Sequence, residues 1–310
     1  MKLLRHGEPG QEKPGLLDAD GIVRDLSTLI DDIAPATLDA ATLARLRAVD
    51  PTTLPVVPAG RLGVPVAGIG KIVAIGLNYV DHAKEANLPL PAEPLVFLKA
   101  TSALSGPDDP VVLPPGAVKG DWEVELGLVI GRRASHVDEA SALDHVAGYC
   151  VANDVSERSY QFERGGSWDK GKGCDSFGPV GPWLVTTDEV PDPQALALRL
   201  DVNGQRMQDG HTGNMIFSCA QLVSYVSRFM TLEPGDLIIT GTPAGVGLGH
   251  KPDPRFLRPG DVMTLGIAGL GEQRQVVRSW QEAPRRGPAG PDERAAAPGQ
   301  GQGQGQGASA

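Results

Sequence analysis

Apolar residues alternate with polar or small residues over residues 122–130, and this alternation predicts a β-strand. One face carries Trp122, Val124, Leu126, Leu128 and Ile130. Glu123 and Glu125 share the other face, and because a strand rises about 3.3 Å per residue they lie roughly 6 to 7 Å apart. Two carboxylates this close repel each other unless a cation or water lies between them. The strand therefore suggests a cation site, with two solvent-facing glutamates as the alternative.

Short apolar segments bounded by glycine and proline recur along the chain and predict further strands. These are expected at residues 71–76, 95–99, 148–153, 182–187, 197–202, 236–240 and 262–267. An amphipathic helix is predicted over residues 218–230, where Leu222, Val223, Val226 and Phe229 share one side. Strands outnumber helices, so the expected fold class is a β-rich α+β fold and not a doubly wound one.

The chain divides into three parts by composition. Residues 1–64 predict a small N-terminal α+β domain, with a hairpin at 15–23 and a short helix at 37–49. Residues 65–281 hold the remaining strands and form the predicted main domain. Residues 282–310 are rich in glycine, glutamine and proline. They bury too little apolar surface to order themselves and predict a disordered tail.

The balance of charge narrows the classes of partner. With 28 Lys and Arg against 38 Asp and Glu, the net charge is −10, which disfavours nucleic acid and anionic membranes. No stretch of about 18 apolar residues predicts a membrane span. Cys150, Cys174 and Cys219 fit neither a disulfide framework nor a paired-cysteine metal site. Reduced thiols in a cytoplasmic protein are the expectation.

A third acidic residue follows the next predicted strand. Residues 148–153 are apolar and end in Asn153, and Asp154 comes directly after them. Together with Glu123 and Glu125, Asp154 offers three carboxylates to a hard cation such as Mg²⁺ or Mn²⁺. The alternative role for Asp154 is that of a turn or cap residue.

His82 and Glu85 are a candidate for acid–base chemistry. Their spacing of three residues places both side chains on one helical turn. A carboxylate beside an imidazole orients it and makes it a base for activating water. An exposed histidine on a charged turn is the alternative.

Two glycine-rich segments need separate interpretation. Residues 166–172 match a phosphate-binding loop, but Gly173 stands where a hydroxyl should hold Mg²⁺, so such a loop is not expected. Lys172 is then either a buried ammonium in a site or a surface lysine. Residues 240–247 follow a strand and could present backbone N–H groups to a carboxylate, with a plain tight loop as the alternative.

Taken together, these motifs resemble those of the fumarylacetoacetate hydrolase family. The matching segments are residues 76–85, 97–99, 121–126, 153–161, 171–172, 175–179 and 240–245, within a resemblance that spans about residues 70–280. Residues 2–5 and 10–18 are similar to a branch that contains 2,4-diketo-3-deoxy-L-fuconate or L-rhamnonate hydrolases and ureidoglycolate lyases.

The resemblance implies a fold, a cofactor and a set of site residues. The fold would be a roll of mixed β-sheets, commonly a homodimer, that binds one Mg²⁺, Mn²⁺ or Ca²⁺. Carried over by position, the metal ligands would be Glu123, Glu125 and Asp154, and the catalytic residues His82, Glu85 and Lys172. Arg158, Gln161 and Thr242 would contact a small 2-oxo acid substrate.

The implied activity is metal-dependent hydrolysis of a C–C bond in a 2,4-dioxo acid, with release of pyruvate. The similar branch points to a 2,4-diketo-3-deoxy sugar acid as substrate. The alternatives on the same fold are a ureidoglycolate lyase, an oxaloacetate-type decarboxylase and a 2-oxo acid hydratase or isomerase. A binding module without activity is a further alternative, but the intact acidic residues, His82 and Lys172 disfavour it.

Overall fold

The computed structural model describes residues 1–283. Almost all of the predicted tail, residues 282–310, therefore lies outside the described residues. The N-terminal part contains β1 (Lys2–His6), β2 (Lys13–Leu17), β3 (Val23–Asp25) and α1 (Ala40–Arg47). The other α-helices of the described residues are α2 (Val80–Glu85), α3 (Arg158–Phe162), α4 (Asp169–Lys172) and α5 (Cys219–Ser227), and seven short 3-10 helices occur besides them.

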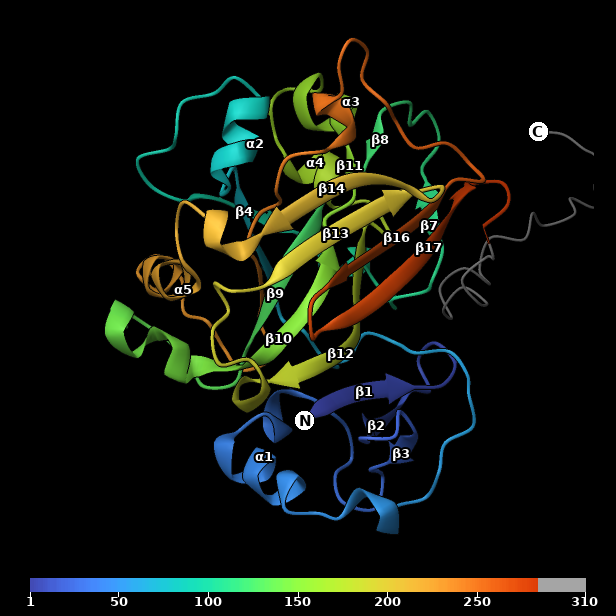
Figure 1. Ribbon diagram of the computed structural model, residues 1–310, viewed down its shortest axis with the longest axis vertical. Helices are drawn as coiled ribbons and strands as arrows, with labels where there is room; N and C mark the ends of the chain where they lie inside the picture. Colours follow the sequence, from blue (N-terminus) through green and yellow to red (C-terminus); the bar gives the residue numbers. More distant parts are fainter. Residues whose placement is uncertain (284–310) are drawn as a thin grey trace, which may run out of the picture.

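A ten-stranded sheet forms the centre of the molecule (Figure 1). Its order is β3-β2-β1-β12-β10-β9-β15-β4-β5, with β6 pairing β12. The strands not yet given bounds are β4 (Ile72–Gly76), β5 (Leu95–Lys99), β6 (Leu104–Ser105), β9 (Val124–Ile130), β10 (Val146–Asn153), β12 (Gly178–Thr186) and β15 (Leu237–Ile239). The N-terminal strands continue this sheet, because β1 pairs with β12 through Lys2 and Leu3.

Two smaller sheets complete the strand set. A five-stranded sheet has the order β14-β13-β16-β17-β7, and a two-stranded sheet pairs β11 with β8. Their bounds are β7 (Val111–Leu113), β8 (Gly120–Asp121), β11 (Ser156–Glu157), β13 (Ala197–Val202), β14 (Gln205–His211), β16 (Val262–Ile267) and β17 (Gly271–Ser279).

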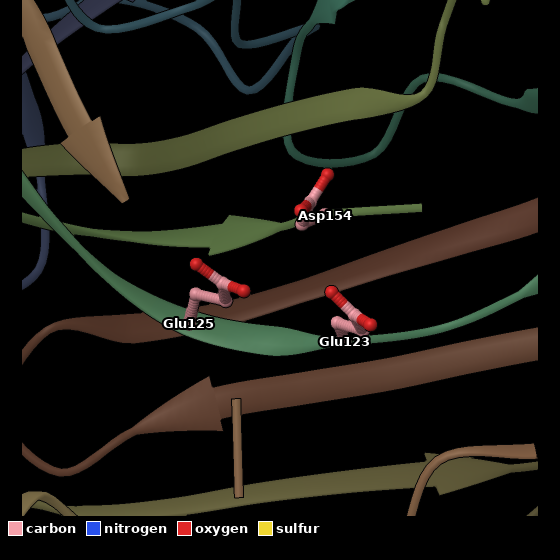
Figure 2. A group of neighbouring side chains, drawn as sticks. All are labelled: Glu123, Glu125 and Asp154. Atoms are coloured by element: carbon pink, nitrogen blue, oxygen red, sulfur yellow. The ribbon is translucent and has the colours of Figure 1, made fainter. Parts of the chain in front are cut away.

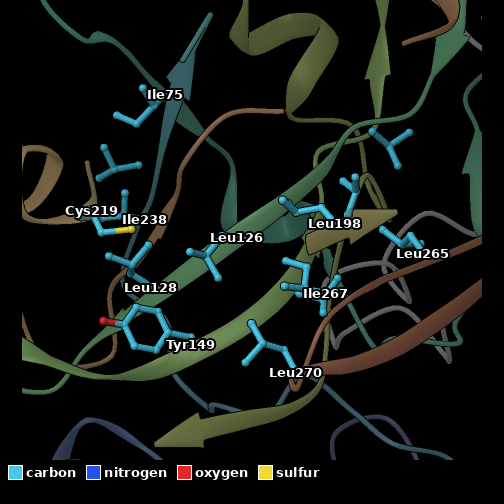
Figure 3. Packing of buried hydrophobic residues seen from close by; sticks show 14 of the residues in the cluster. Ile75, Leu126, Leu128, Tyr149, Leu198, Cys219, Ile238, Leu265, Ile267 and Leu270 are labelled. Atoms are coloured by element: carbon cyan, nitrogen blue, oxygen red, sulfur yellow. The ribbon is translucent and has the colours of Figure 1, made fainter. Parts of the chain in front are cut away.

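Strand β9 is covered on both faces. The period-two residues Val124, Leu126, Leu128 and Ile130 join a large apolar cluster that also contains Leu198 and Leu265 of the five-stranded sheet (Figure 3). Val129 on the opposite face joins a second cluster, which includes Leu3 and Leu16 of the N-terminal part. The strand that carries Glu125, and that Glu123 directly precedes, is therefore packed between two cores.

The expected elements are confirmed with small changes of boundary. The strand predicted at 122–130 begins at Val124, and the helix predicted at 218–230 ends at Ser227. Ser218 begins that helix with a capping box, since its hydroxyl accepts from Gln221 N while Gln221 accepts from Ser218 N. The hairpin at 15–23 corresponds to β2 and β3, and the helix at 37–49 to α1.

Strands β14 and β17 were not expected from the sequence. Their buried positions are held in part by glutamines, namely Gln208, Gln273 and Gln275, all with 0% exposure. Gln273 donates to the carbonyls of Val151 and Gly181, at 2.8 and 3.0 Å, and thereby ties β17 to the central sheet. A search for apolar alternation overlooks strands whose inward side chains are polar and fully hydrogen-bonded.

All three cysteines are free thiols, as expected. Cys150 and Cys219 are buried, and burial raises the pKa of each thiol to about 12. Within residues 1–283, no helix has the length and apolar character that crossing a membrane requires.

Candidate active site

Three carboxylates meet at one end of β9 (Figure 2). Strands β9 and β10 pair so that Val124 lies opposite Asn153, and Asp154 N donates to the Glu123 carbonyl at 2.9 Å. One oxygen each from Glu123, Glu125 and Asp154 lie within 4.8 Å of one another. The three residues are 5%, 2% and 1% exposed, so the alternative of solvent-facing glutamates is wrong.

Buried cations compensate part of this negative charge. Lys172 Nζ donates to Glu123 Oε2 at 2.6 Å and to Asp154 Oδ2 at 2.7 Å. Arg158 Nη2 donates to Glu123 Oε1 at 2.7 Å, and Lys99 Nζ donates to Asp154 Oδ1 at 2.7 Å. Lys172 is thus buried among the predicted ligands, and the alternative of a surface lysine is wrong.

Glu125 is the least compensated member of the group. Its carboxylate accepts a hydrogen bond from Gly241 N at 2.8 Å and forms no ion pair with a lysine or arginine of the described chain. Burial, followed by the charges of Asp154 and Glu123, raises the pKa of Glu125 well above its usual value. Burial also acts to raise the pKa of Glu123, but Lys172 and Arg158 outweigh it and lower that pKa to about 2.

This donor set fits a hard divalent cation. Three carboxylate oxygens from separate residues converge without any sulfur or imidazole ligand among them. A bound cation would stabilise the ionised form of Glu125, which pairs with no lysine or arginine of the described chain. Glu123, Glu125 and Asp154 are therefore the residues that would hold Mg²⁺, Mn²⁺ or Ca²⁺.

His82 and Glu85 form a contact on α2. His82 Nδ1 lies 3.0 Å from Glu85 Oε2, and the second oxygen of Glu85 accepts from Gly245 N at 2.9 Å. An ionised carboxylate only accepts hydrogen bonds, so Nδ1 carries the hydrogen and Nε2 is left as the basic nitrogen. Both side chains are 16% exposed and line the same cavity as Glu123 and Glu125.

The glycine-rich loop at residues 240–249 positions acidic side chains from three parts of the chain. Its backbone N–H groups donate to Glu125 from Gly241 and to Glu85 from Gly245. Gly247 N and Leu248 N donate to Asp121 at 2.6 and 3.0 Å. The loop does present N–H groups to carboxylates, but these belong to the protein.

The close packing of this loop gives a testable expectation. Gly245 has φ of 104°, and a Cβ there would lie 1.9 Å from the Met207 carbonyl oxygen. We expect Gly245→Ala to reduce the free energy of unfolding by at least about 3 kcal/mol, because strain and a backbone clash add. Urea denaturation followed by circular dichroism measures this loss.

Gly204→Ala is the matched control for Gly245→Ala. Gly204 also has positive φ, at 75°, but a Cβ there would meet nothing within 4 Å. Its substitution should cost only about 1 kcal/mol, the strain of the left-handed conformation. Equal losses in the two variants would contradict the packing argument.

The predicted substrate-binding residues line the cavity, yet their hydrogen bonds point into the protein. Arg158 bonds Asp121 through Nε at 2.8 Å, in addition to Glu123, and Gln161 Oε1 through Nη1 at 3.0 Å. Thr242 Oγ1 donates to the Val124 carbonyl at 2.9 Å and accepts from Gln208 at 2.7 Å. These contacts fix the walls of the site around β9.

Two residues with structural roles in the site were not singled out from the sequence. Lys99 is 3% exposed and holds Asp154, Val155 and the Lys172 carbonyl together. Asp121 is fully buried and accepts hydrogen bonds from Arg158, Trp122, Gly247 and Leu248. The available signal was a charged residue at the end of an apolar segment, as Lys99 is for residues 95–99.

The cavity lined by His82, Glu85, Glu123 and Glu125 has a volume of about 430 Å³, the size of a small-molecule site. Its charged lining consists of Glu123, Glu125, Arg158, Lys172, the His82–Glu85 pair and Lys251. The other walls are mostly apolar and include Leu77, Leu88, Leu95, Phe97, Phe162, Trp168, Val246 and Leu248. Among the described residues, Lys251 is the charged lining residue outside the carboxylates, Arg158, Lys172 and the His82–Glu85 pair.

Comparison with known proteins identifies the family. The sequence profile described as "Fumarylacetoacetate (FAA) hydrolase C-terminal" matches residues 71–278. A relative from Burkholderia multivorans, named as a hydrolase without a stated substrate, is 61% identical over 280 residues. That match covers 90% of this chain and 99% of the relative.

Solved structures with similar folds include a hydrolase and an isomerase. Maleylpyruvate hydrolase from Sphingobium, crystallised with manganese(II) and pyruvate, is 30% identical with a TM-score of 0.75, covering 90% of this chain and 99% of that one. The 5-carboxymethyl-2-hydroxymuconate delta-isomerase from Mycobacterium smegmatis is 33% identical with a TM-score of 0.72, at the same coverages. The expected β-rich α+β fold of this family is confirmed.

Proposed function

The chain belongs to the fumarylacetoacetate hydrolase family, and from that premise we propose that it is a divalent-metal-dependent hydrolase of 2,4-dioxo acids. The observation that carries the proposal is the cavity lined by Glu123, Glu125 and the His82–Glu85 pair, in which the two glutamates cluster with Asp154. One group of residues suits a metal that would bind a 2-oxo acid, and the other suits a base that activates water.

Glu123, Glu125 and Asp154 would hold the cation, with Mg²⁺ or Mn²⁺ favoured and Ca²⁺ as an alternative. A bound cation supplies a Lewis acid for the 2-oxo carboxylate end of the substrate and for the negative charge that develops there. Lys172 uses two N–H groups on Glu123 and Asp154, so its third can donate to the substrate oxygen. That hydrogen bond stabilises enolate charge beside the metal.

His82 would activate the water. Nε2 accepts a proton from water as the water oxygen attacks the C4 carbonyl, and Glu85 stabilises the imidazolium through Nδ1. The new C4–O bond forms, and the C3–C4 bond then breaks with its electron pair passing to C3. The acyl group leaves as a carboxylic acid, and the proton held at His82 Nε2 passes to C3 of the enolate to give pyruvate, which restores the base.

The alternatives differ in whether water is needed. The oxaloacetate-type decarboxylase and the isomerase use the metal site without an activated water, and the isomerase neighbour gives the latter specific support. The half-buried contact of His82 with Glu85 favours hydrolysis, because a positioned base serves water activation. A sugar-acid substrate and a ureidoglycolate lyase activity stay as predictions from the sequence.

The test of this proposal is a pyruvate-release assay on the purified full chain. A panel of 2,4-dioxo acids is supplied with Mg²⁺ or Mn²⁺, and pyruvate is detected with a coupled dehydrogenase. We expect release of pyruvate and the matching carboxylic acid in equal amounts, abolished by EDTA and restored by added metal. Carbon dioxide from oxaloacetate without cleavage of any dioxo acid would overturn the proposal.

We also propose that the protein is a homodimer and that it is located in the cytoplasm. Strand β5 ends the ten-stranded sheet, and Leu95, Val96 and Leu98 on it are 42%, 36% and 46% exposed. An apolar edge strand can pair antiparallel with its own copy about a two-fold axis. Light scattering should give twice the chain mass, and a monomer would contradict the dimer.

The free thiols are compatible with a reducing compartment, such as the cytoplasm.

A further inference from the structure

The walls of the cavity beyond the metal-binding carboxylates carry a cluster of three aromatic rings. Trp168 packs edge-to-face against Phe97, with ring centroids 5.3 Å apart, and against Phe162 at 6.0 Å. Lys172 Nζ lies 5.4 Å from the centre of the Phe97 ring. The aromatic cluster therefore begins directly beside the charged end, where the reacting part of a substrate would lie.

This part of the cavity has few hydrogen-bonding groups to offer. Among the described residues that line it, the uncharged hydrogen-bonding side chains are Gln161, Thr242 and the indole N–H of Trp168. Gln161 Oε1 is engaged by Arg158, and the Thr242 hydroxyl by Val124 and Gln208. A substrate with several hydroxyl groups would lose hydrogen bonds to water and gain few in return.

Resting on the proposed function, we propose that the acyl group of the substrate is apolar, either aromatic or aliphatic. The aromatic cluster of Phe97, Phe162 and Trp168 would bind that group and set specificity. An aryl ring packs well against aromatic edges and faces, and burial of its surface favours it over a hydroxylated chain. A 2,4-diketo-3-deoxy sugar acid is then a poor substrate for this chain.

Lys251 defines the rival to this assignment. It lines the cavity and could pair with a second carboxylate at the far end of a dicarboxylic substrate. Lys251 is exposed, so an ion pair there is screened by water and adds little binding. The apolar walls therefore contribute more to the free energy of substrate binding than an ion pair with Lys251 does.

The experiment compares kcat/KM for four substrates with the metal-loaded full chain. These are benzoylpyruvate, acetylpyruvate, maleylpyruvate and a 2,4-diketo-3-deoxy sugar acid. We expect benzoylpyruvate to exceed the sugar acid by about 30-fold or more. A preference for the sugar acid, or a preference for maleylpyruvate that Lys251→Met removes, would overturn the proposal.

A pair of phenylalanine variants tests the aromatic cluster itself. Phe162 is 49% exposed, so Phe162→Ser should fold, and it should lower kcat/KM for benzoylpyruvate by about 10-fold. The same change should lower kcat/KM for acetylpyruvate by less than about twofold, because its methyl group is small. Phe229→Ser is the control, since Phe229 is 66% exposed and does not line the cavity. Equal effects of Phe162→Ser on the two substrates would contradict the assignment.

A binding measurement separates this inference from the proposed reaction. Calorimetry with Mg²⁺ present compares pyruvate with 2-oxo-4-phenylbutanoate, which share the 2-oxo acid end and differ in the apolar group. We expect the phenyl compound to bind at least about 10-fold more tightly, and Phe162→Ser to reduce that ratio. If no dioxo acid is cleaved but this ratio holds, the proposed hydrolysis fails while the apolar subsite stands. Equal affinities would overturn the subsite.

Discussion

Glu125→Gln is expected to lower the affinity for Mg²⁺ by at least about 100-fold and to abolish cleavage of 2,4-dioxo acids. The substitution removes the charge of a proposed ligand while keeping its size and its acceptor for Gly241 N. Without metal, the variant should unfold at a higher temperature than the wild type, because the repulsion from Glu123 and Asp154 is gone. Isothermal calorimetry measures the affinity, and thermal unfolding with EDTA or Mg²⁺ measures the stability.

In Glu125→Gln the Mg²⁺ affinity should fall while the unfolding temperature without metal should rise. This combination distinguishes a metal ligand from a residue with a structural role alone. Mg²⁺ at 100 times the wild-type dissociation constant should stabilise the wild type by about 2.7 kcal/mol and the variant by at most about 0.4 kcal/mol. Glu139→Gln is the control, because Glu139 is exposed and lies outside the acidic cluster. Unchanged Mg²⁺ affinity in Glu125→Gln would show that the three carboxylates do not form the metal site.

His82→Asn is expected to reduce kcat for dioxo-acid hydrolysis by about 10²- to 10⁴-fold while Mg²⁺ affinity stays the same. The substitution removes the basic Nε2, and the three carboxylates form no hydrogen bond with His82. Pyruvate release gives kcat, and calorimetry gives the metal affinity. Glu85→Gln should have a smaller effect of about 10- to 100-fold, because it weakens the orientation of His82 without removing the base.

His136→Asn is a suitable control for the histidine variant. His136 is exposed and has φ of 52°, a conformation that asparagine tolerates. Its activity should equal that of the wild type. Full activity of His82→Asn on the preferred substrate would favour an isomerase or decarboxylase that needs only the metal.

The sequence predicted the acidic part of the site well, because local patterns encode it. Alternation over residues 122–130 places Glu123 and Glu125 on one face of a strand, and Asp154 directly follows an apolar segment. Antiparallel pairing of β9 with β10 brings the two glutamates close to Asp154. The spacing of His82 and Glu85 likewise predicted a contact that a single helical turn creates.

The remaining features depend on contacts between distant parts of the chain. Gly245 holds Glu85 across 160 positions, and Lys99 holds Asp154 across 55 positions, which no local pattern reveals. Strands β14 and β17 were overlooked for a different reason, since each of their inward glutamines depends on hydrogen bonds to distant parts of the chain. The aromatic cluster joins Phe97 to residues 162 and 168 and also depends on the tertiary fold.

Burial of β9 on both faces determines how this part of the protein unfolds. All seven residues from Val124 to Ile130 are buried, and the strand pairs with β10 and β15. Amide hydrogens in such a strand exchange with deuterium only when most of the fold opens. The proposed metal ligands are therefore released only when the whole sheet unfolds. A bound cation would then slow amide hydrogen exchange far from its own ligands, as far as the N-terminal strands beyond β12.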